Sequence, residues 1–218
     1  MKTITVKGTG NVSVKPDLIV LSLSLRSIDK DYEKVMALAA TKIAELNNSL
    51  EKIGFEKESV KTTDFNVDTD YDSKKARNGN YYRVFNGYVV RHRLKVSFDF
   101  DTKVLSKALG AIAICLAEPE LSVNFTVKDS SAVNEELLKS AAESAKKKAE
   151  ILCAASGVSL GELVNIDYNW GEIDLYSHTR YAMEQDCMMK SCAPAMDIDI
   201  EPDDIDVSDT VTFVWQIN

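Results

Sequence analysis

The sulfur-containing residues of this sequence gather in one segment that could hold a soft metal ion. Between residues 181 and 196 there are two cysteines and four methionines, and His178 lies just before them. Thiolate and thioether sulfurs suit copper(I), and a loop would let them converge on one ion or respond to oxidation. The candidate ligands for such a metal or redox site are His178, Cys187, Met188, Met189 and Cys192.

Other features of the segment favour a simpler interpretation. Four residues separate Cys187 from Cys192, a poor spacing for zinc, and no second cysteine pair accompanies them. Methionine suits adaptable apolar contacts, so we favour a flexible loop or a short apolar arm that packs on a neighbour. The remaining cysteines, Cys115 and Cys153, fall in helical patterns and are expected to fill the core.

Serine-type hydrolysis is not indicated by the histidines. The sequence has two, His92 and His178, and any catalytic triad must use one of them. No Gly-x-Ser-x-Gly motif is present, and His92 falls in phase with Val90 and Leu94, as a half-buried strand residue would. We therefore expect no enzymatic activity and no cofactor.

The glycines near the N-terminus do not form a nucleotide-binding loop. Residue 13 is serine where a dinucleotide motif has its third glycine, and a strand pattern follows where that motif needs a helix. We interpret Gly8-Thr9-Gly10 as a tight turn between two strands.

A run of carboxylates precedes the C-terminal strand pattern. Acidic residues stand at 197, 199, 201, 203, 204 and 206, partly alternating with isoleucine. A calcium loop would need a glycine at its sharp turn and a closing glutamate, and both are missing. We expect an edge strand with a charged outer face.

Composition and charge exclude several classes of protein. The 34 acidic and 26 basic residues give a net charge of −8, which disfavours a phosphate backbone as partner, and we expect no nucleic-acid binding. No apolar stretch approaches the roughly 20 residues that span a bilayer. The first residues lack the apolar region of a signal peptide, so a cytoplasmic location is expected.

Three helices are predicted from stripes of apolar residues. The first runs from a cap at Asp29 to Gly54, the second covers 102–117 with a cap at Thr102, and the third begins at one of residues 129–131 and ends at Gly157. The second stripe includes Leu116, and the inward face of the third ends at Leu152.

Strand alternation surrounds these helices. It is expected over 4–6, 12–25, 60–71, 82–100, 120–127, 163–170 and 207–217, with irregular chain over 171–196. The phase slips near Pro16, which predicts a break or a bulge there. Asn86-Gly87 could be a hairpin turn or a bulge, and the alternation that continues on both sides favours a bulge.

The order of elements repeats and indicates an α+β fold. Strand, helix, strand, strand occurs in each half, so we infer two β-α-β-β units with antiparallel sheet and long helices packed on one side. The expected organisation is a single domain over 1–218, with sub-units at about 1–101 and 118–218 joined by the helix at 102–117.

Several stretches resemble the SIMPL-domain family. The opening segment 4–12, ITVKGTGNV, followed by Lys15-Pro16-Asp17, is similar to the family's N-terminal signature. Residues 87–96 look like its central strand, and residues 141–161 like its alanine-rich helix and the exit from it. The resemblance implies an α+β fold, a tendency to form large homo-oligomers, and no particular chemistry.

The resemblance also bears on function and location. The family includes bacterial envelope proteins, some linked to oxidative-stress tolerance, and a eukaryotic adaptor associated with a kinase, so a periplasmic location is the alternative to a cytoplasmic one. Our first hypothesis is a homo-oligomeric scaffold or binding protein, whose edge strands and segment 171–196 contact neighbouring copies or another protein partner. The alternative is a soft-metal or redox-responsive protein that uses residues 178–196.

Overall fold

The computed structural model of the protein describes residues 2–75, 80–169, 171, 173–179, 181–183 and 200–218. This described part contains three α-helices and eight strands, and the strands form two antiparallel sheets. The predicted α+β class is confirmed. The chain divides into two compact units. The terminal unit holds Met1–Asp17, Phe125–His178 and Pro202–Asn218, and the central unit holds Leu18–Asn124 and Thr179–Glu201.

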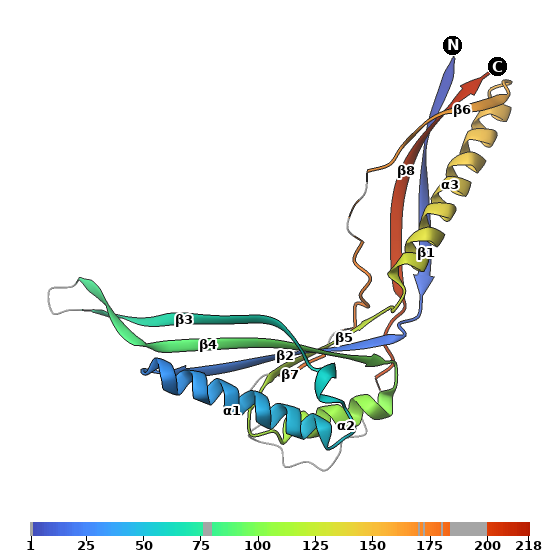
Figure 1. The fold of residues 1–218 in the computed structure, drawn as a ribbon. Coiled ribbons are helices and arrows are strands. Elements are labelled where there is room, and N and C mark those ends of the chain that lie inside the picture. Colours follow the sequence, from blue (N-terminus) through green and yellow to red (C-terminus); the bar gives the residue numbers. More distant parts are fainter. Residues whose placement is uncertain (1, 76–79, 170, 172, 180, 184–199) are drawn as a thin grey trace. The chain divides into compact units, whose positions relative to one another are not determined.

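The terminal unit is a three-stranded sheet with one long helix on it (Figure 1). Strand β8 (Ile205–Ile217) lies in the middle, between β1 (Thr3–Val14) and β6 (Leu160–Asp167). The β1–β8 register is regular from Thr3 opposite Gln216 to Val14 opposite Ile205. Helix α3 (Ser130–Ala155) begins at Asp129, whose carboxylate accepts a hydrogen bond from the Ala132 N–H at 2.9 Å.

Gly8 and Gly10 lie inside β1 and do not form the predicted turn. A Cβ atom on Gly8 would lie 2.0 Å from the Ala141 carbonyl oxygen, and one on Gly10 would lie 2.1 Å from the Leu137 carbonyl oxygen. The two glycines therefore let the backbone of α3 approach the backbone of β1. The turn prediction was wrong. Two glycines close together in the sequence are typical of a turn, but they also occur in a strand whose one face lies against another backbone.

The buried face of α3 recurs every four residues: Val133, Leu137, Ala141, Ala145, Ala149 and Cys153. Such a row is inclined to the helix axis, as expected where a straight helix lies on twisted strands. Cys153 completes the row in place of Leu152, which was predicted to face inward and is half exposed. Cys115 and Cys153 are both buried and unbonded to each other, as predicted.

The central unit is a five-stranded sheet in the order β3-β4-β2-β5-β7. Its strands are β2 (Leu18–Asp29), β3 (Lys61–Lys75), β4 (Tyr81–Asp99), β5 (Glu120–Thr126) and β7 (Tyr181–Met183). Helices α1 (Tyr32–Glu51) and α2 (Thr102–Ala113) cover one face, and a short 3-10 turn, η1 (Lys57–Ser59), precedes β3. The core contains four buried leucine or isoleucine residues of β2: Ile19, Leu21, Leu23 and Leu25.

Aspartates one or two residues away from the expected positions cap the first two helices. Asp31, rather than Asp29, accepts from the N–H groups of Glu33 and Lys34, and Asp29 instead accepts from the Asp31 N–H at 2.8 Å. Asp101, rather than Thr102, is the N-cap of α2, and its carboxylate accepts from the N–H groups of Lys103 and Val104. Helix α2 ends at Ala113, so Leu116 escapes the predicted stripe and is 82% exposed.

The predicted break near Pro16 is confirmed, because β1 ends at Val14 and β2 begins at Leu18. Asp17 holds the chain there. Its N–H donates to the Thr126 carbonyl oxygen at 3.0 Å, and its carboxylate accepts from the Lys128 N–H at 2.7 Å.

The repeated order of elements is present as β2-α1-β3-β4 and β5-α3-β6-β8, but the sheets do not follow it. Strand β5 of the second repeat joins the central sheet, and β1, which precedes the first repeat, pairs with β8. The two compact units are therefore not consecutive halves of the chain. The expectation of a single domain stays a prediction.

Candidate interaction site

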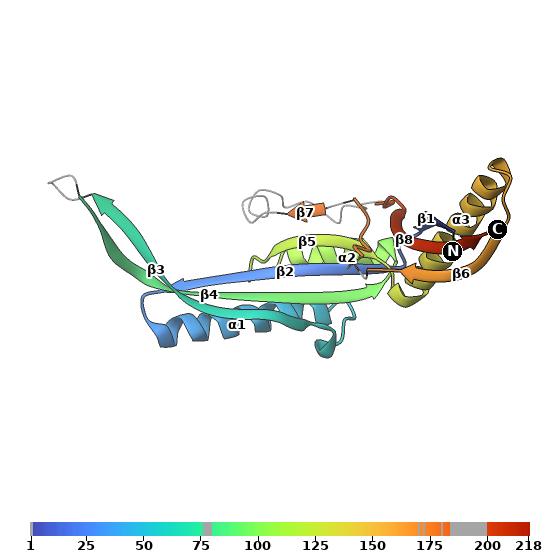
Figure 2. The ribbon, with the colours of Figure 1, turned by 90° about the horizontal axis from the view of Figure 1, so that it is seen from above.

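A two-stranded ribbon extends beyond the core of the central unit (Figures 1 and 2). Strand β2 ends at Asp29, opposite Tyr88 of β4, and past that point β4 pairs with β3 alone. We use "the ribbon" for Tyr71–Lys75 and Tyr81–Phe85, which form five cross-strand pairs. An isolated two-stranded hairpin is marginally stable in water, so its side chains must stabilise it.

A β-bulge separates the ribbon from the core. The register passes from Asp70 opposite Gly87 to Tyr71 opposite Phe85, which leaves Asn86 without a cross-strand partner on β3. The Asn86 side-chain amide donates to the Asp70 carboxylate at 2.8 Å. Gly87 has φ = 156°, and a Cβ there would lie 2.7 Å from the Asp29 carbonyl oxygen.

The bulge was predicted, but its effect on the alternation was not. An extra residue reverses which face each following side chain occupies. The even-numbered residues of β4 therefore do not share one face along its whole length. Tyr82 and Val84 lie opposite to the face that carries Tyr88 and Val90, and the odd-numbered ribbon residues continue that face instead.

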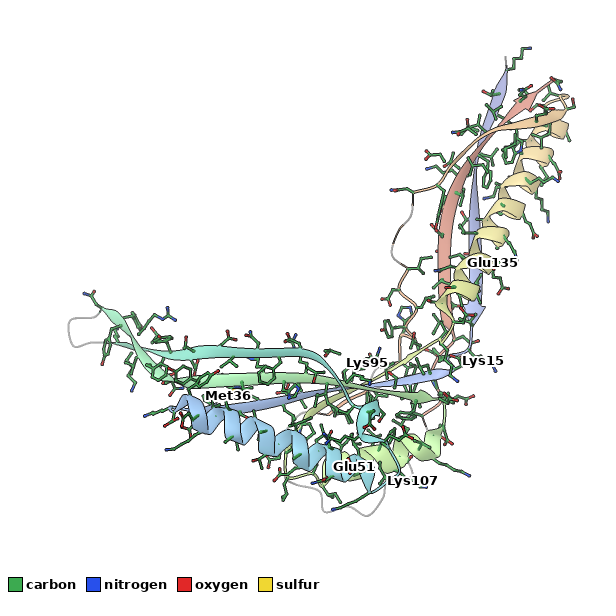
Figure 3. The ribbon with its side chains drawn as sticks, in the orientation of Figure 1. Lys15, Met36, Glu51, Lys95, Lys107 and Glu135 are labelled. Atoms are coloured by element: carbon green, nitrogen blue, oxygen red, sulfur yellow. The ribbon has the colours of Figure 1, made fainter. Side chains whose placement is uncertain are left out.

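Aromatic side chains form a ladder along this continuous face. Edge-to-face contacts join Tyr71 to Phe85 at 5.7 Å between ring centroids, Phe85 to Tyr88 at 5.3 Å, and Tyr88 to Tyr32 of α1 at 5.5 Å. Such pairs contribute about 0.5–1.5 kcal/mol each beyond the area that they bury. The ladder thus connects the ribbon to the first turn of α1, close to Met36, which is labelled in Figure 3.

Cations are interleaved with the aromatic rings of the ribbon. The Arg83 guanidinium lies 4.5 Å from the ring centroid of Tyr71, and Lys75 Nζ lies 6.0 Å from that of Tyr81. Tyr81 is nevertheless 69% exposed and Tyr82 53% exposed. Exposed tyrosines beside arginine are typical of residues that dominate protein interfaces.

A second exposed apolar surface lies on β6 in the terminal unit. This strand is at the edge of its sheet, and every residue of Glu162–Asp167, which we call the β6 edge, is exposed. Three of the six are large and apolar: Leu163, Val164 and Ile166. Register shifts on either side of Leu163 interrupt the pairing with β8, a device that often blunts an edge strand.

His92 is a half-buried strand residue, as predicted. Its Nε2 lies 2.8 Å from the Thr62 hydroxyl, and its ring meets that of Phe65 edge to face at 5.1 Å between centroids. Burial lowers the pKa of the imidazole below its ordinary value. In the described part of the chain no carboxylate bonds to the other ring nitrogen, so the Thr62–His92 pair lacks the third member of a triad.

Most of the predicted soft-metal ligands fall outside the described residues. Cys187, Met188, Met189 and Cys192 lie there, and His178 is described and exposed. Among the residues with described positions, no three His, Cys, Asp or Glu side chains come close enough to hold a metal ion. The soft-metal hypothesis stays a prediction.

The acidic stretch before β8 does not form the expected edge strand where it is described. Residues 200–204 belong to no strand, and Asp206 lies in β8, the middle strand of its sheet. Asp197 and Asp199 lie outside the described residues. A hydrogen bond holds this stretch to the preceding segment: the Ser177 hydroxyl donates to the Asp203 carbonyl oxygen at 2.8 Å.

The described helices include none that combines the length and apolar character needed to cross a bilayer. Two curated relatives are the 26 kDa periplasmic immunogenic proteins of Brucella melitensis biotype 1 and Brucella abortus strain S19. Each is 26% identical to this chain over 163 residues, which cover 75% of the chain and 65% of the relative. The chain thus spans slightly less than two thirds of the length of these relatives.

A family model described as "SIMPL: Protein of unknown function (DUF541)" matches residues 4–215. The match includes both strands that pair at the termini, the ribbon and the β6 edge. With nearly its whole length matched, this chain belongs to the SIMPL family.

Proposed function

We propose that this protein is a non-enzymatic scaffold or binding protein that works as a homo-oligomer. The observation that carries the proposal is the exposure of large apolar side chains on the ribbon and on the β6 edge. Proteins that stay monomeric rarely expose contiguous apolar patches larger than roughly a few hundred Å², and larger patches mark interaction sites.

Unpaired strand edges support the same proposal. In the described part of the chain, β3 ends the central sheet and β6 ends the terminal sheet. Thirteen of the 15 residues of β3 are exposed, so no helix or loop among the described residues covers that edge. An open edge offers unpaired backbone N–H and C=O groups to another strand, and association is one way to cover them.

Charge on β3 limits which associations are favourable. Asp64 and Asp68 bond to Arg93 and Arg91 of β4 at 3.7 and 2.9 Å, and both pairs are well exposed. Exposed ion pairs contribute little to stability, about 1 kcal/mol at most. Their charges do, however, discourage unselective pairing of this edge, which is consistent with a defined contact.

The non-enzymatic part of the proposal rests on His92. It is the histidine held within a strand, it contacts Thr62 and Phe65, and burial favours its neutral form. To activate the Thr62 hydroxyl as a nucleophile, His92 would need a partner that orients its ring and a space beside the hydroxyl for a substrate.

A periplasmic location is proposed from the relatives. Their names place those Brucella proteins in the periplasm. Cell fractionation of the natural host tests this location against the cytoplasmic one expected from the first residues of the sequence.

Gel filtration with light scattering tests the proposed assembly. We expect a mass that is a fixed multiple of the chain mass. In a C187S/C192S variant this mass should not change with reductant, because the remaining cysteines, Cys115 and Cys153, are buried. A chain mass at every concentration would refute the proposal.

A further inference from the structure

We propose that the ribbon of one copy binds the β6 edge of a second copy. The inference rests on the proposed homo-oligomeric function and names the two surfaces that meet. Each copy carries one of each surface, so two copies can exchange the contact reciprocally, or the contact can repeat from copy to copy until a ring closes or a chain extends.

The apolar side chains of the two surfaces complement each other. Tyr81 and Tyr82 stand at the outer end of the ribbon and are the more exposed of its aromatic residues. Leu163 and Ile166 on the β6 edge are each about half exposed, at 47% and 52%. Tyr81 and Tyr82 are neighbours on one strand and point to opposite faces of the ribbon, so the ring of one of them would lie against Leu163 and Ile166. That contact would remove the ring and the aliphatic side chains from water and leave the phenol hydroxyl at the rim.

Charges on the two surfaces are opposite in sign. The ribbon carries Lys74, Lys75 and Arg83 with one carboxylate, Asp72. The β6 edge carries Glu162 and Asp167 with no cation. The net charges are therefore +2 on the ribbon (three cations less one carboxylate) and −2 on the β6 edge, although the whole chain is at −8. Complementary charge raises the association rate and fixes the register of a contact.

Contacts between identical surfaces are less favourable. Two ribbons would bring their cations together. Two β6 edges paired antiparallel about their centre would place Glu162 directly opposite Asp167, and like charges opposite each other destabilise a strand pair. The opposite arrangement joins an edge of each kind, because in the described part of the chain the Tyr81–Phe85 strand of the ribbon pairs with β3 alone and β6 is the outer strand of its sheet. Backbone pairing can then add to the side-chain contacts.

An anionic bilayer is the other partner that tyrosines and cations on a ribbon would suit. Such a bilayer would not bind the β6 edge, because both carry negative charge. The second copy accounts for both surfaces, and we make membrane binding an outcome of the test.

Two variants that each lose one surface test the contact. Y81S/Y82S removes the ribbon anchors and leaves the β6 edge intact, and L163S/I166S does the reverse. All four side chains are exposed, so the fold should survive, and circular dichroism with a thermal melt checks that it does. The matched control is I114S/L116S, because Ile114 and Leu116 are 81% and 82% exposed and belong to neither surface.

The mass of each protein is measured by light scattering, alone and in an equal mixture of the two variants. We expect multimers for the wild type and for I114S/L116S, and monomers for each surface variant alone. The mixture should give a dimer of twice the chain mass, because the intact ribbon of one variant and the intact β6 edge of the other form a single contact that cannot propagate.

Other outcomes overturn the inference in distinguishable ways. A monomeric wild type removes the proposed function as well as this contact. A multimeric wild type with a multimeric Y81S/Y82S variant keeps the proposed function and refutes this contact. Monomeric variants that fail to dimerise when mixed also refute it. Binding of wild type, but not Y81S/Y82S, to phosphatidylserine vesicles with unchanged multimer mass would assign the ribbon to a membrane.

Discussion

Phe85 and Tyr88 are three positions apart on β4, yet their rings meet edge to face at 5.3 Å between centroids. In a regular strand, residues separated by three lie on opposite faces. The bulge at Asn86 brings these two onto one face, and so joins the aromatic residues of the ribbon to those beside α1. A single extra residue thereby determines which side chains the ribbon presents to a partner.

Gly87→Ala tests how strictly this bulge requires glycine. The new Cβ would meet the Asp29 carbonyl oxygen at 2.7 Å at a φ of 156°, so we expect a loss of about 1–3 kcal/mol in the free energy of unfolding. Urea denaturation measures it. Gly110→Ala in α2 is the control, since a Cβ there has no atom within 4 Å, and it should gain up to about 1 kcal/mol. Equal changes in the free energy of unfolding for the two variants would contradict the requirement for glycine at the bulge.

Gly8→Ala tests the close approach of α3 to β1. We expect a loss of at least about 3 kcal/mol, because the nearest obstacle is the Ala141 carbonyl oxygen and backbone cannot move aside as a side chain can. Adding Ala145→Gly should not restore stability for the same reason. Thr9→Ala, whose side chain points to the other face of β1, should cost less than about 1 kcal/mol. A folded, fully stable Gly8→Ala protein would disprove the contact.

The pKa of His92 predicts a dependence of stability on pH. Burial lowers the pKa of the folded imidazole below its ordinary 6.5, so the unfolded chain binds the proton more readily. The free energy of unfolding should therefore fall as the pH drops from 6.5 toward the lowered pKa, and be unaffected by this group above that range. His92→Gln keeps a polar partner for Thr62 and does not titrate. The stability advantage of the wild type over this variant should shrink between about pH 7 and about pH 5, as followed by urea midpoints. An advantage that grew in acid would contradict the assigned cause.

Copper(I) uptake separates the scaffold hypothesis from the soft-metal alternative. Because we favour an apolar or flexible role for residues 178–196, replacing Cys187 and Cys192 together with serine should leave uptake unchanged in competition with a chelator. A clear drop in affinity for the double variant would favour the metal site. Cys153→Ser, at a buried position, controls for a general effect of losing a thiol.

Local patterns predicted the elements well where one face of an element is buried throughout. The long stripe of α3 and the alternation from Tyr88 to Phe98 of β4 are of this kind, and both elements form nearly as expected. The aspartate caps at residues 31 and 101 were displaced by one or two positions, because several side chains in each sequence could accept the same N–H bonds.

Contacts between distant segments could not be derived in this way. Gly8 is explained by Ala141, which lies far away in the sequence, and the place of β5 beside β2 depends on a pairing that no short pattern encodes. The ribbon was missed for a related reason. The strand patterns were expected to end at residue 71 and to resume at 82, which left Asp72–Lys75 and Tyr81 outside any strand. The paired tyrosines followed by Arg83 were the signal available, since exposed tyrosine beside arginine is typical of interfaces.

The absolute mass of the purified wild-type protein in solution tests the central claim most directly. If further copies cover the exposed strands and aromatic residues, light scattering should return a fixed multiple of the chain mass over a wide range of concentrations. The measured mass should decrease only at the lowest concentrations, where the multimer dissociates. A single chain mass throughout, with the protein still folded, would contradict the account.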